Sequence, residues 1–277
     1  MVGMVSAIAV ESIQPVTVYL MDNGVRTDHK AFEGIQIESV DLTSEPRQTD
    51  SSQRLAIGGK GMAFGDHATL LAGLIVERAP EVKLISVRTL DDNGKGSWSE
   101  FVKGVHWIIN HHQMGKPAVA NLSLGGSVDD PRIQRLITHT IEQLVAEGVV
   151  VVVAAGNDGM DDKQRIPSTL DSVISVGAVS MFDRRLDSSN FGSCVDLYAR
   201  GKDLEGPGSY SNIFRTRQSG TSVAAAVVAG HLAVRILEKP ESTPRQIKQW
   251  VLQQSVAGKV KNIPGRDANE ALLFRDP

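Results

Sequence analysis

Cysteine and aromatic side chains are scarce in this sequence. Of its 277 residues a single one is a cysteine, Cys194, and only 5% are aromatic. One cysteine excludes an internal disulfide and any metal site built from several cysteines. We interpret Cys194 as a small buried residue rather than as a nucleophile.

A strong net charge and long apolar runs are also missing. The formal net charge of -3 gives no reason to expect nucleic acid or an anionic membrane as a partner. No apolar run reaches the ~18 residues expected of a membrane-spanning helix. Residues 1–10 carry no Lys or Arg and do not predict a signal peptide. Either the protein is processed ahead of residue 1 or it is cytoplasmic.

The remaining composition favours one large folded unit. Hydrophobic residues make up 41% of the chain, which is enough for a single large core. There is no internal repeat, no low-complexity tract and no linker, so we expect one domain over residues 1–277. Residues 43–66 are polar and glycine-rich, and they predict a long surface loop.

Short β-branched runs alternate with longer helical patterns along the chain. Residues 149–153 are five consecutive valines, which is typical of a central parallel strand buried on both faces. The alternation predicts an α/β fold: a doubly wound, mostly parallel sheet flanked by helices in three layers. The predicted strands are 16–21, 82–88, 119–126, 149–155, 173–178 and 195–199, and the predicted helices are 67–76, 97–110, 133–147, a helix from 222, and 245–254.

Ser222 lies where a small, polar turn becomes an Ala/Val run. A hydroxyl at the first turn of a helix is close to unsatisfied backbone N–H groups and to the positive end of the helix dipole. It can cap the helix, or it can be a nucleophile whose oxyanion is met by those N–H groups. Taken alone, the cap is favoured because such caps are common.

Three more polar residues lie at the ends of predicted elements. Asp22 and Asn157 follow predicted strands, and His67 begins a predicted helix. Each also has an ordinary explanation, as a turn residue or as a structural histidine at a helix start. Ser-His-Asp chemistry needs a nucleophile, a base and an orienting acid, and Asp, His, Ser is one of the known chain orders of such a triad.

Several sequence blocks make the chain similar to one family. Residues 22–24 (DNG), 67–73 (HATLLAG), 121–126 (NLSLGG), 154–157 (AAGN) and 220–225 (GTSVAA) follow one another in the order of the blocks of subtilisin-like serine proteases. Residues 183–185 and 190–192 add support. The chain resembles this family from about residue 16 to 275, nearest to its proteinase K branch.

The resemblance implies roles for these residues. Asp22 would orient His67, His67 would act as general base and acid, Ser222 would be the nucleophile, and Asn157 would bind the oxyanion. It implies a serine endopeptidase that forms an acyl-enzyme, has broad or apolar-leaning specificity, and needs no cofactor for catalysis.

The resemblance also implies a cleft for an extended peptide. Two segments would pair with the peptide by added-strand hydrogen bonds: Lys95, Gly96 and Ser97, and Ser123, Leu124 and Gly125. Ala155, Gly156 and residues 166–169 would wall the pocket for the side chain before the scissile bond. Because these residues are small, we expect room for an apolar or aromatic side chain.

Structural calcium is common in the family. By position, the carboxylate of Asp196 and the carbonyls of Asp171 and Val173 would form one such site, and the alternative is a solvated loop. The resemblance further implies a secreted monomer that meets protein substrates, and a propeptide or inhibitor as a partner. No propeptide domain is expected within residues 1–277.

Departures from the family pattern keep other functions open. Asn23 replaces a hydroxyl residue beside the acid, Ala68 replaces a glycine, and Leu70 replaces a second histidine. None of these removes a catalytic group. One alternative is a catalytically impaired protein of the same fold that acts as a binding or regulatory module, and another is an esterase with the same triad.

Overall fold

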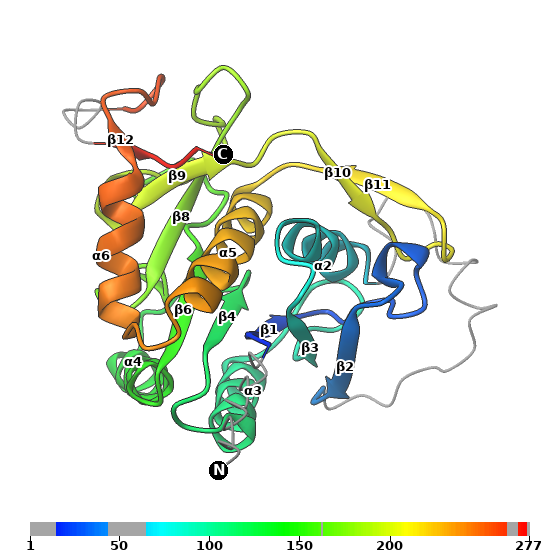
Figure 1. Ribbon diagram of the computed structural model, residues 1–277. Coiled ribbons are helices and arrows are strands. Elements are labelled where there is room, and N and C mark those ends of the chain that lie inside the picture. The colour runs from blue at the N-terminus through cyan, green and yellow to red at the C-terminus, as the bar shows by residue number, and fades with distance from the viewer. Residues whose placement is uncertain (1–14, 44–64, 162, 265–270, 276–277) are drawn as a thin grey trace, which may run out of the picture.

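The computed structural model describes residues 15–43, 65–161, 163–264 and 271–275. The surface loop predicted for residues 43–66 lies almost wholly outside these ranges. The described part is built around one large sheet with helices on both faces (Figure 1).

The central sheet has nine strands, which pair in parallel except for β12 with β13. The predicted doubly wound, mostly parallel sheet is therefore confirmed. Across the sheet the strands are β12 (Val256–Ala257), β13 (Leu272–Leu273), β9 (Leu197–Arg200), β8 (Ile174–Val179), β6 (Val149–Ala154), β4 (Ala118–Leu122), β1 (Thr17–Asp22), β3 (Lys83–Arg88) and β2 (Gln36–Asp41).

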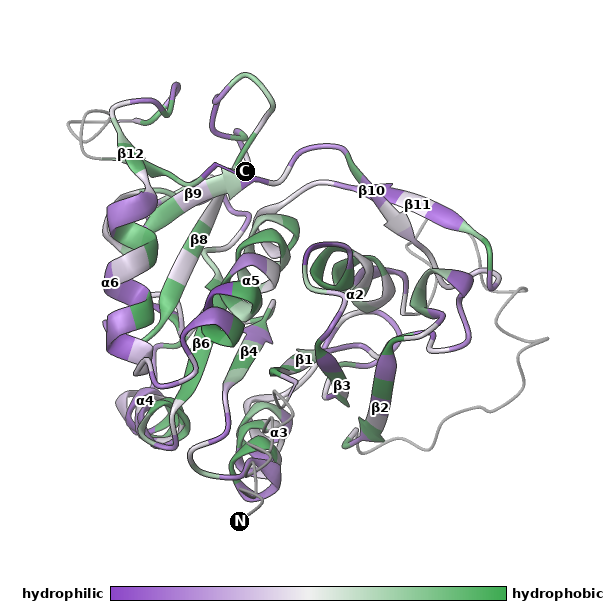
Figure 2. Ribbon diagram, in the orientation of Figure 1, coloured by the Kyte–Doolittle hydropathy of each residue, from purple (hydrophilic) through white to green (hydrophobic). Residues whose placement is uncertain are grey.

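The valine run of β6 shows how the three layers arise. Val150 and Val152 pack in one apolar core with α2 (Asp66–Arg78), α5 (Thr221–Glu238) and α6 (Pro244–Gln254). Val149, Val151 and Val153 pack in a second core with α3 (Trp98–His111) and α4 (Pro131–Ala146). Successive side chains of a strand point to opposite faces, so one strand supplies both cores. Figure 2 shows the apolar residues gathered on the sheet and on the helix sides that meet it.

Local signals set the helix ends. Ser97 caps α3 in a capping box with Glu100, as its sequence predicts. Thr243 caps α6 in the same way with Gln246, and Asp130 caps α4. These side chains accept hydrogen bonds from backbone N–H groups that have no partner within the helix.

Helix α5 runs through the middle of the molecule and is the core helix of the fold. By length and composition alone it could cross a membrane, but 72% of it is buried against the rest of the protein. It packs closely on α2 at Gly230, where an added Cβ would lie 3.2 Å from the carbonyl oxygen of Ile75. A glycine there lets the two helices approach each other.

Several short elements were not predicted. They are the edge strand β2, the antiparallel pairs β10 (Leu204–Pro207) with β11 (Arg215–Gln218) and β5 (Gly126–Ser127) with β7 (Arg165–Ile166), the strands β12 and β13, and the 3-10 turns η1 (Lys30–Phe32) and η2 (Gly192–Cys194). Strands β2 and β11 are largely exposed and polar, so they lack the apolar periodicity that identifies a strand. Cys194 is buried, as predicted.

Candidate active site

The carboxyl ends of the central strands bring the predicted site residues to one edge of the sheet. Asp22 is the last residue of β1, and Ser123 directly follows β4. Asn157 lies just beyond β6. Because these strands are parallel neighbours, their ends meet at the same edge, where α/β proteins place their ligands.

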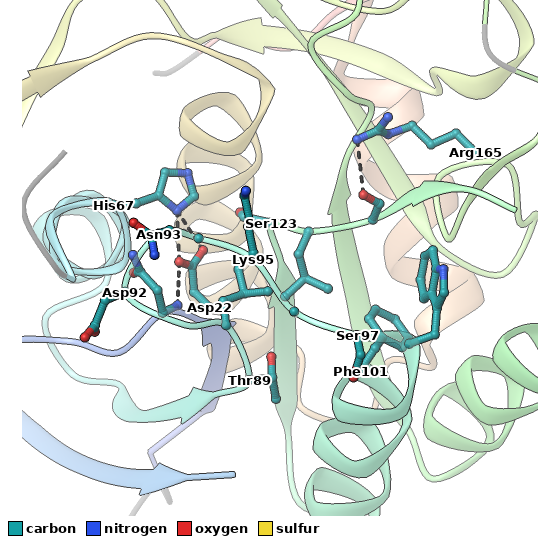
Figure 3. Close-up of a pocket in the computed structure, with 17 residues that line it drawn as sticks. Asp22, His67, Thr89, Asp92, Asn93, Lys95, Ser97, Phe101, Ser123 and Arg165 are labelled. Atoms are coloured by element: carbon teal, nitrogen blue, oxygen red, sulfur yellow. Dashed lines mark hydrogen bonds and ion pairs between the residues drawn. The ribbon is translucent and has the colours of Figure 1, made fainter. Parts of the chain in front are cut away.

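Asp22 and His67 form a buried pair (Figure 3). Nδ1 of His67 lies 2.8 Å from Oδ2 and 3.0 Å from Oδ1 of Asp22. The side chain of Asp22 is only 1% exposed, and that of His67 is 21% exposed. Carboxylate oxygens only accept hydrogen bonds, so the neutral imidazole carries its proton on Nδ1 and leaves Nε2 able to accept one.

The environment shifts the pKa of His67. Burial lowers this pKa, but the negative charge of Asp22 and its hydrogen bonds to the ring raise it by more, so the pKa lies above its ordinary value. The protonated imidazole is therefore favoured next to Asp22. A base that has to gain a proton during a reaction benefits from such a partner.

Asn23 has a structural role that its sequence position did not reveal. Its Oδ1 accepts a hydrogen bond of 3.2 Å from the backbone N–H of Ala68, in the first turn of α2. Gly65, the N-cap of this helix, provides no side-chain acceptor. The backbone N–H of Asn23 also donates to Oδ1 of Asp22 at 2.7 Å. Asn23 thus ties the acid-bearing strand to the helix that begins at His67.

Ser222 lies in the first turn of α5, but it is not the helix cap. The N-cap is Gly220, with φ of 145°, which has no side chain that could cap the helix. The interpretation of Ser222 as a cap is therefore wrong. Ser222 is the second residue of α5, in the turn whose backbone N–H groups have no acceptor within the helix.

Asn157 is held against the start of α5 by Thr221. Oδ1 of Asn157 accepts from the backbone N–H of Thr221 at 3.0 Å and from its hydroxyl at 3.2 Å. The Thr221 hydroxyl oxygen also accepts from the N–H of Gly156 at 3.2 Å. Because the amide oxygen of Asn157 is used in this way, its Nδ2 is the group left to donate elsewhere.

Two residues that support this arrangement were missed as functional residues. Thr221 was quoted in a family block without a role. Asn190, which is fully buried, donates to the carbonyl of Ala155 at 3.0 Å and accepts from the N–H of Asp158 at 3.0 Å. Both stand in blocks that resemble the family, and Thr221 directly precedes Ser222; these were the available signals.

The predicted residues are only partly joined by direct contacts. Asp22 contacts His67, and Asn157 contacts the start of α5, but within the described residues no hydrogen bond links Ser222 to His67. Helices α2 and α5, which carry His67 and Ser222, pack against each other in one core. Hydrogen bonds of a catalytic group are often loose before a substrate binds.

A cleft of about 670 Å³ runs from the Asp22–His67 pair along the sheet edge. It is lined by both predicted peptide-binding segments: Lys95, Gly96 and Ser97, and Ser123, Leu124 and Gly125. Residues 123–125 belong to no strand, although the sequence predicted that the strand continues through them. Ala155 and Gly156 do not line this cleft. Arg165, which was not predicted, lies at its far end (Figure 3).

The groups predicted to hold calcium meet around a lysine side chain instead. Nζ of Lys248 lies 2.7 Å from the carbonyl oxygen of Val173, 3.1 Å from that of Asp171, and 2.8 and 2.9 Å from the two carboxylate oxygens of Asp196. An ammonium group at the centre of these oxygens uses the contacts that a metal ion would need. The site as folded does not fit calcium, and Lys248, on α6, supplies the positive charge itself.

A family model confirms the resemblance seen in the sequence. The model of the subtilase family, Peptidase_S8, matches residues 14–271. The chain belongs to the subtilase family. Within the family, its place near the proteinase K branch stays a prediction.

Relatives of this subtilase are named as proteases. It is 33% identical over 250 residues to subtilisin-like protease 2 of Pseudogymnoascus destructans, which covers 90% of this chain and 58% of that protein. It is 33% identical over 260 residues to an extracellular serine proteinase of a Thermus species, which covers 92% of this chain and again 58% of the relative. The chain thus spans little more than half the length of these curated relatives.

A solved structure agrees in fold. The crystal structure of a cold adapted subtilisin-like serine proteinase superimposes with a TM-score of 0.76 at 29% sequence identity. The match covers 94% of this subtilase and 88% of the other chain.

Proposed function

We propose that this subtilase is a serine endopeptidase that uses Asp22, His67 and Ser222 as a triad and Asn157 as an oxyanion donor. The observation that carries the proposal is the buried Asp22–His67 pair, which leaves Nε2 of His67 unused at the mouth of the cleft. The relatives named as serine proteases agree with this chemistry.

The first half of the proposed reaction forms an acyl-enzyme. Oγ of Ser222 attacks the carbonyl carbon of the scissile peptide bond, and its proton passes to Nε2 of His67. Asp22 stabilises the imidazolium that results, which agrees with the raised pKa of His67. Nδ2 of Asn157 and the backbone N–H of Ser222 would bind the oxyanion. The proton of His67 then goes to the leaving amine as the C–N bond breaks.

The second half releases the acyl group. Water attacks the ester carbonyl, and His67 takes a proton from this water and returns it to Oγ of Ser222. The same two donors would bind the second oxyanion. No group other than water is consumed, and atoms and charges balance over the two halves.

The cleft fits an extended peptide as substrate. The segments 95–97 and 123–125 both line it, so a peptide bound between them would form added-strand hydrogen bonds with both. An added Cβ at Gly96 would lie 2.8 Å from the carbonyl oxygen of Thr89, so a side chain there would disturb this wall. A propeptide or a strand-like inhibitor would dock in the same way.

One observation favours a second candidate, a binding module with impaired catalysis. It is the missing hydrogen bond between Ser222 and His67. The Asn23 departure, which first suggested this alternative, gives it less support because Asn23 fixes the start of α2.

Labelling with a fluorophosphonate probe separates the candidates. We expect Ser222 to be labelled in folded protein, casein to be cleaved, and both signals to disappear in Ser222→Ala. Folded protein that takes up no probe and cleaves no casein would refute the protease proposal. An ester substrate compared with a peptide of matched sequence identifies an enzyme that acts on esters alone.

A further inference from the structure

Arg165 closes the far end of the cleft with a cationic group. Nη2 of Arg165 donates to the carbonyl oxygen of Gly125 at 3.3 Å. On the other side, an added Cβ at Gly156 would lie 2.5 Å from Nε and 2.7 Å from Cζ of the same side chain. The guanidinium thus spans the gap between the backbones of Gly125 and Gly156, and its hydrogen bond is the dashed line at Arg165 in Figure 3.

The backbone at Arg165 is well fixed. Arg165 pairs with Ser127 in the ladder of β5 and β7. Its carbonyl oxygen accepts from the N–H of Thr169 at 3.1 Å and from the Thr169 hydroxyl at 2.8 Å. The side chain is only 18% exposed. The positive charge is therefore part of the folded wall and does not belong to a surface loop.

The charge of Arg165 lies close to the proposed oxyanion donor. Gly156 directly precedes Asn157, the proposed oxyanion donor. In the substrate, the residue before the scissile bond supplies the attacked carbonyl. Its side chain is attached to the Cα next to that carbonyl, so this side chain has to enter the space beside residues 156–157. That space is bounded by segment 123–125 opposite and by Arg165 at its end.

Asp158 is an acidic partner of Arg165 that a substrate would have to replace. Its carboxylate lies 2.7 Å from Nη1 of Arg165, and its side chain is 51% exposed. A half-exposed carboxylate can turn into solvent at little loss. A guanidinium also binds a planar carboxylate at two N–H groups.

We propose that Arg165 makes this subsite select an acidic side chain, glutamate or aspartate, immediately before the scissile bond. The assignment rests on the proposed protease function. A large apolar side chain would cover the guanidinium without giving it a hydrogen bond, which is unfavourable for a buried charge. The small residues of the pocket walls had suggested an apolar or aromatic preference, and Arg165 reverses that expectation.

Four peptides of one sequence test the assignment, with Glu, Gln, Ala or Phe before the cleaved bond. We expect kcat/KM for the Glu peptide to exceed that for the Gln peptide about 10- to 100-fold, which is the range of a charge-assisted hydrogen bond. Arg165→Met should abolish this ratio and raise cleavage of the Phe peptide. Lys163→Met is the matched control, because Lys163 carries the same charge two residues away but is 74% exposed. It should leave the ratio unchanged.

Two further measurements test the role of Arg165 independently of the Arg165→Met variant and of turnover. Asp158→Asn leaves Arg165 in place and removes a carboxylate that competes with the substrate for it. This variant should therefore increase the preference for Glu, and it provides a test even if Arg165→Met fails to fold. Fluorescence anisotropy of the same peptides on Ser222→Ala measures the preference without turnover.

The outcomes separate the two proposals. Preferential binding of the Glu peptide with no cleavage by the wild-type protein would support the role of Arg165 and overturn the protease proposal. Cleavage or binding in which Glu is no better than Gln, or in which Ala or Phe is best, would overturn the role of Arg165.

Discussion

Replacing Lys248 with methionine removes one positive charge and keeps most of the side-chain volume. Four oxygen atoms then lose the ammonium group that lies between them: the two of the Asp196 carboxylate and the carbonyl oxygens of Asp171 and Val173. The change leaves a partly buried carboxylate without its ion-pair partner. We expect the variant to fold but to be less stable.

The magnitude follows from how exposed the ion pair is. Removing one partner of a fully buried ion pair costs about 3–5 kcal/mol of folding free energy, whereas exposed pairs contribute about 0–1 kcal/mol. The side chains of Lys248 and Asp196 are 18% and 25% exposed, which places the pair between these limits. We therefore expect a loss of about 2–3 kcal/mol, which lowers Tm by about 4–10 °C for a domain of this size.

Thermal unfolding in EDTA and in Ca²⁺ is the assay. The destabilisation should appear in EDTA, where no cation replaces the ammonium. Ca²⁺ should raise the Tm of Lys248→Met by more than it raises that of the wild-type protein, because the vacated oxygens can then hold a cation. Lys259→Met, at an exposed position, is the control and should leave Tm unchanged.

Two results would contradict this account of Lys248. One is a Tm in EDTA that is the same for Lys248→Met as for the wild-type protein. The other is an equal response of both proteins to Ca²⁺, which would show that the vacated oxygens bind no cation.

Three further predictions concern the proposed triad and its supports. Asp22→Asn should lower kcat by about 10⁴. In the wild-type protein kcat/KM should rise with pH as His67 loses its proton, with a midpoint above the ordinary 6.5. In the variant this midpoint should lie lower, because the negative charge that raises the pKa of His67 is gone. A midpoint that does not move would contradict the pairing. Asn157→Ala should lower kcat by about 10²–10³ with little change in KM, and a change confined to KM would argue against an oxyanion donor. Asn23→Ala should destabilise the fold by about 1–2 kcal/mol in urea unfolding, because the N–H of Ala68 loses its acceptor. Asn23→Ser keeps an acceptor and should lose less stability. Equal losses in the two variants would exclude the role of Asn23 as this acceptor.

The fold was predictable where hydrophobic patterns are strong. The five valines of β6 and the capping box of α3 identify their elements directly, because burial on two faces and a reciprocal cap both leave local signals. Strand β11 was not predictable, since its residues Arg215 and Arg217 pair with Glu205 across a surface hairpin. Its stability comes from a partner strand rather than from a local apolar pattern.

The part of the site that lies at the carboxyl ends of the strands was predictable from the sequence. Asp22 and Asn157 could be placed at one edge because parallel strands end together. The ion pair of Lys248 could not be predicted, because no local sequence pattern indicates that α6 contacts Asp196, which is 52 residues away. Arg165 was missed for a different reason: it directly precedes residues 166–169, which were predicted to wall the pocket, but that prediction considered the small residues of the walls and not this long side chain.

The hydrogen bonds of Thr221 and Asn23 join the proposed catalytic groups in two pairs. Thr221 ties the start of α5 to residues 156–157, so the proposed nucleophile is anchored next to the proposed oxyanion donor. Asn23 ties the end of β1 to α2, so the proposed acid is anchored next to the proposed base. The two helices α2 and α5 meet at Gly230, where an added Cβ would lie 3.2 Å from the carbonyl oxygen of Ile75. We therefore expect a bulky residue at Gly230 to push the helices apart and to change the distance between Ser222 and His67 without contacting either.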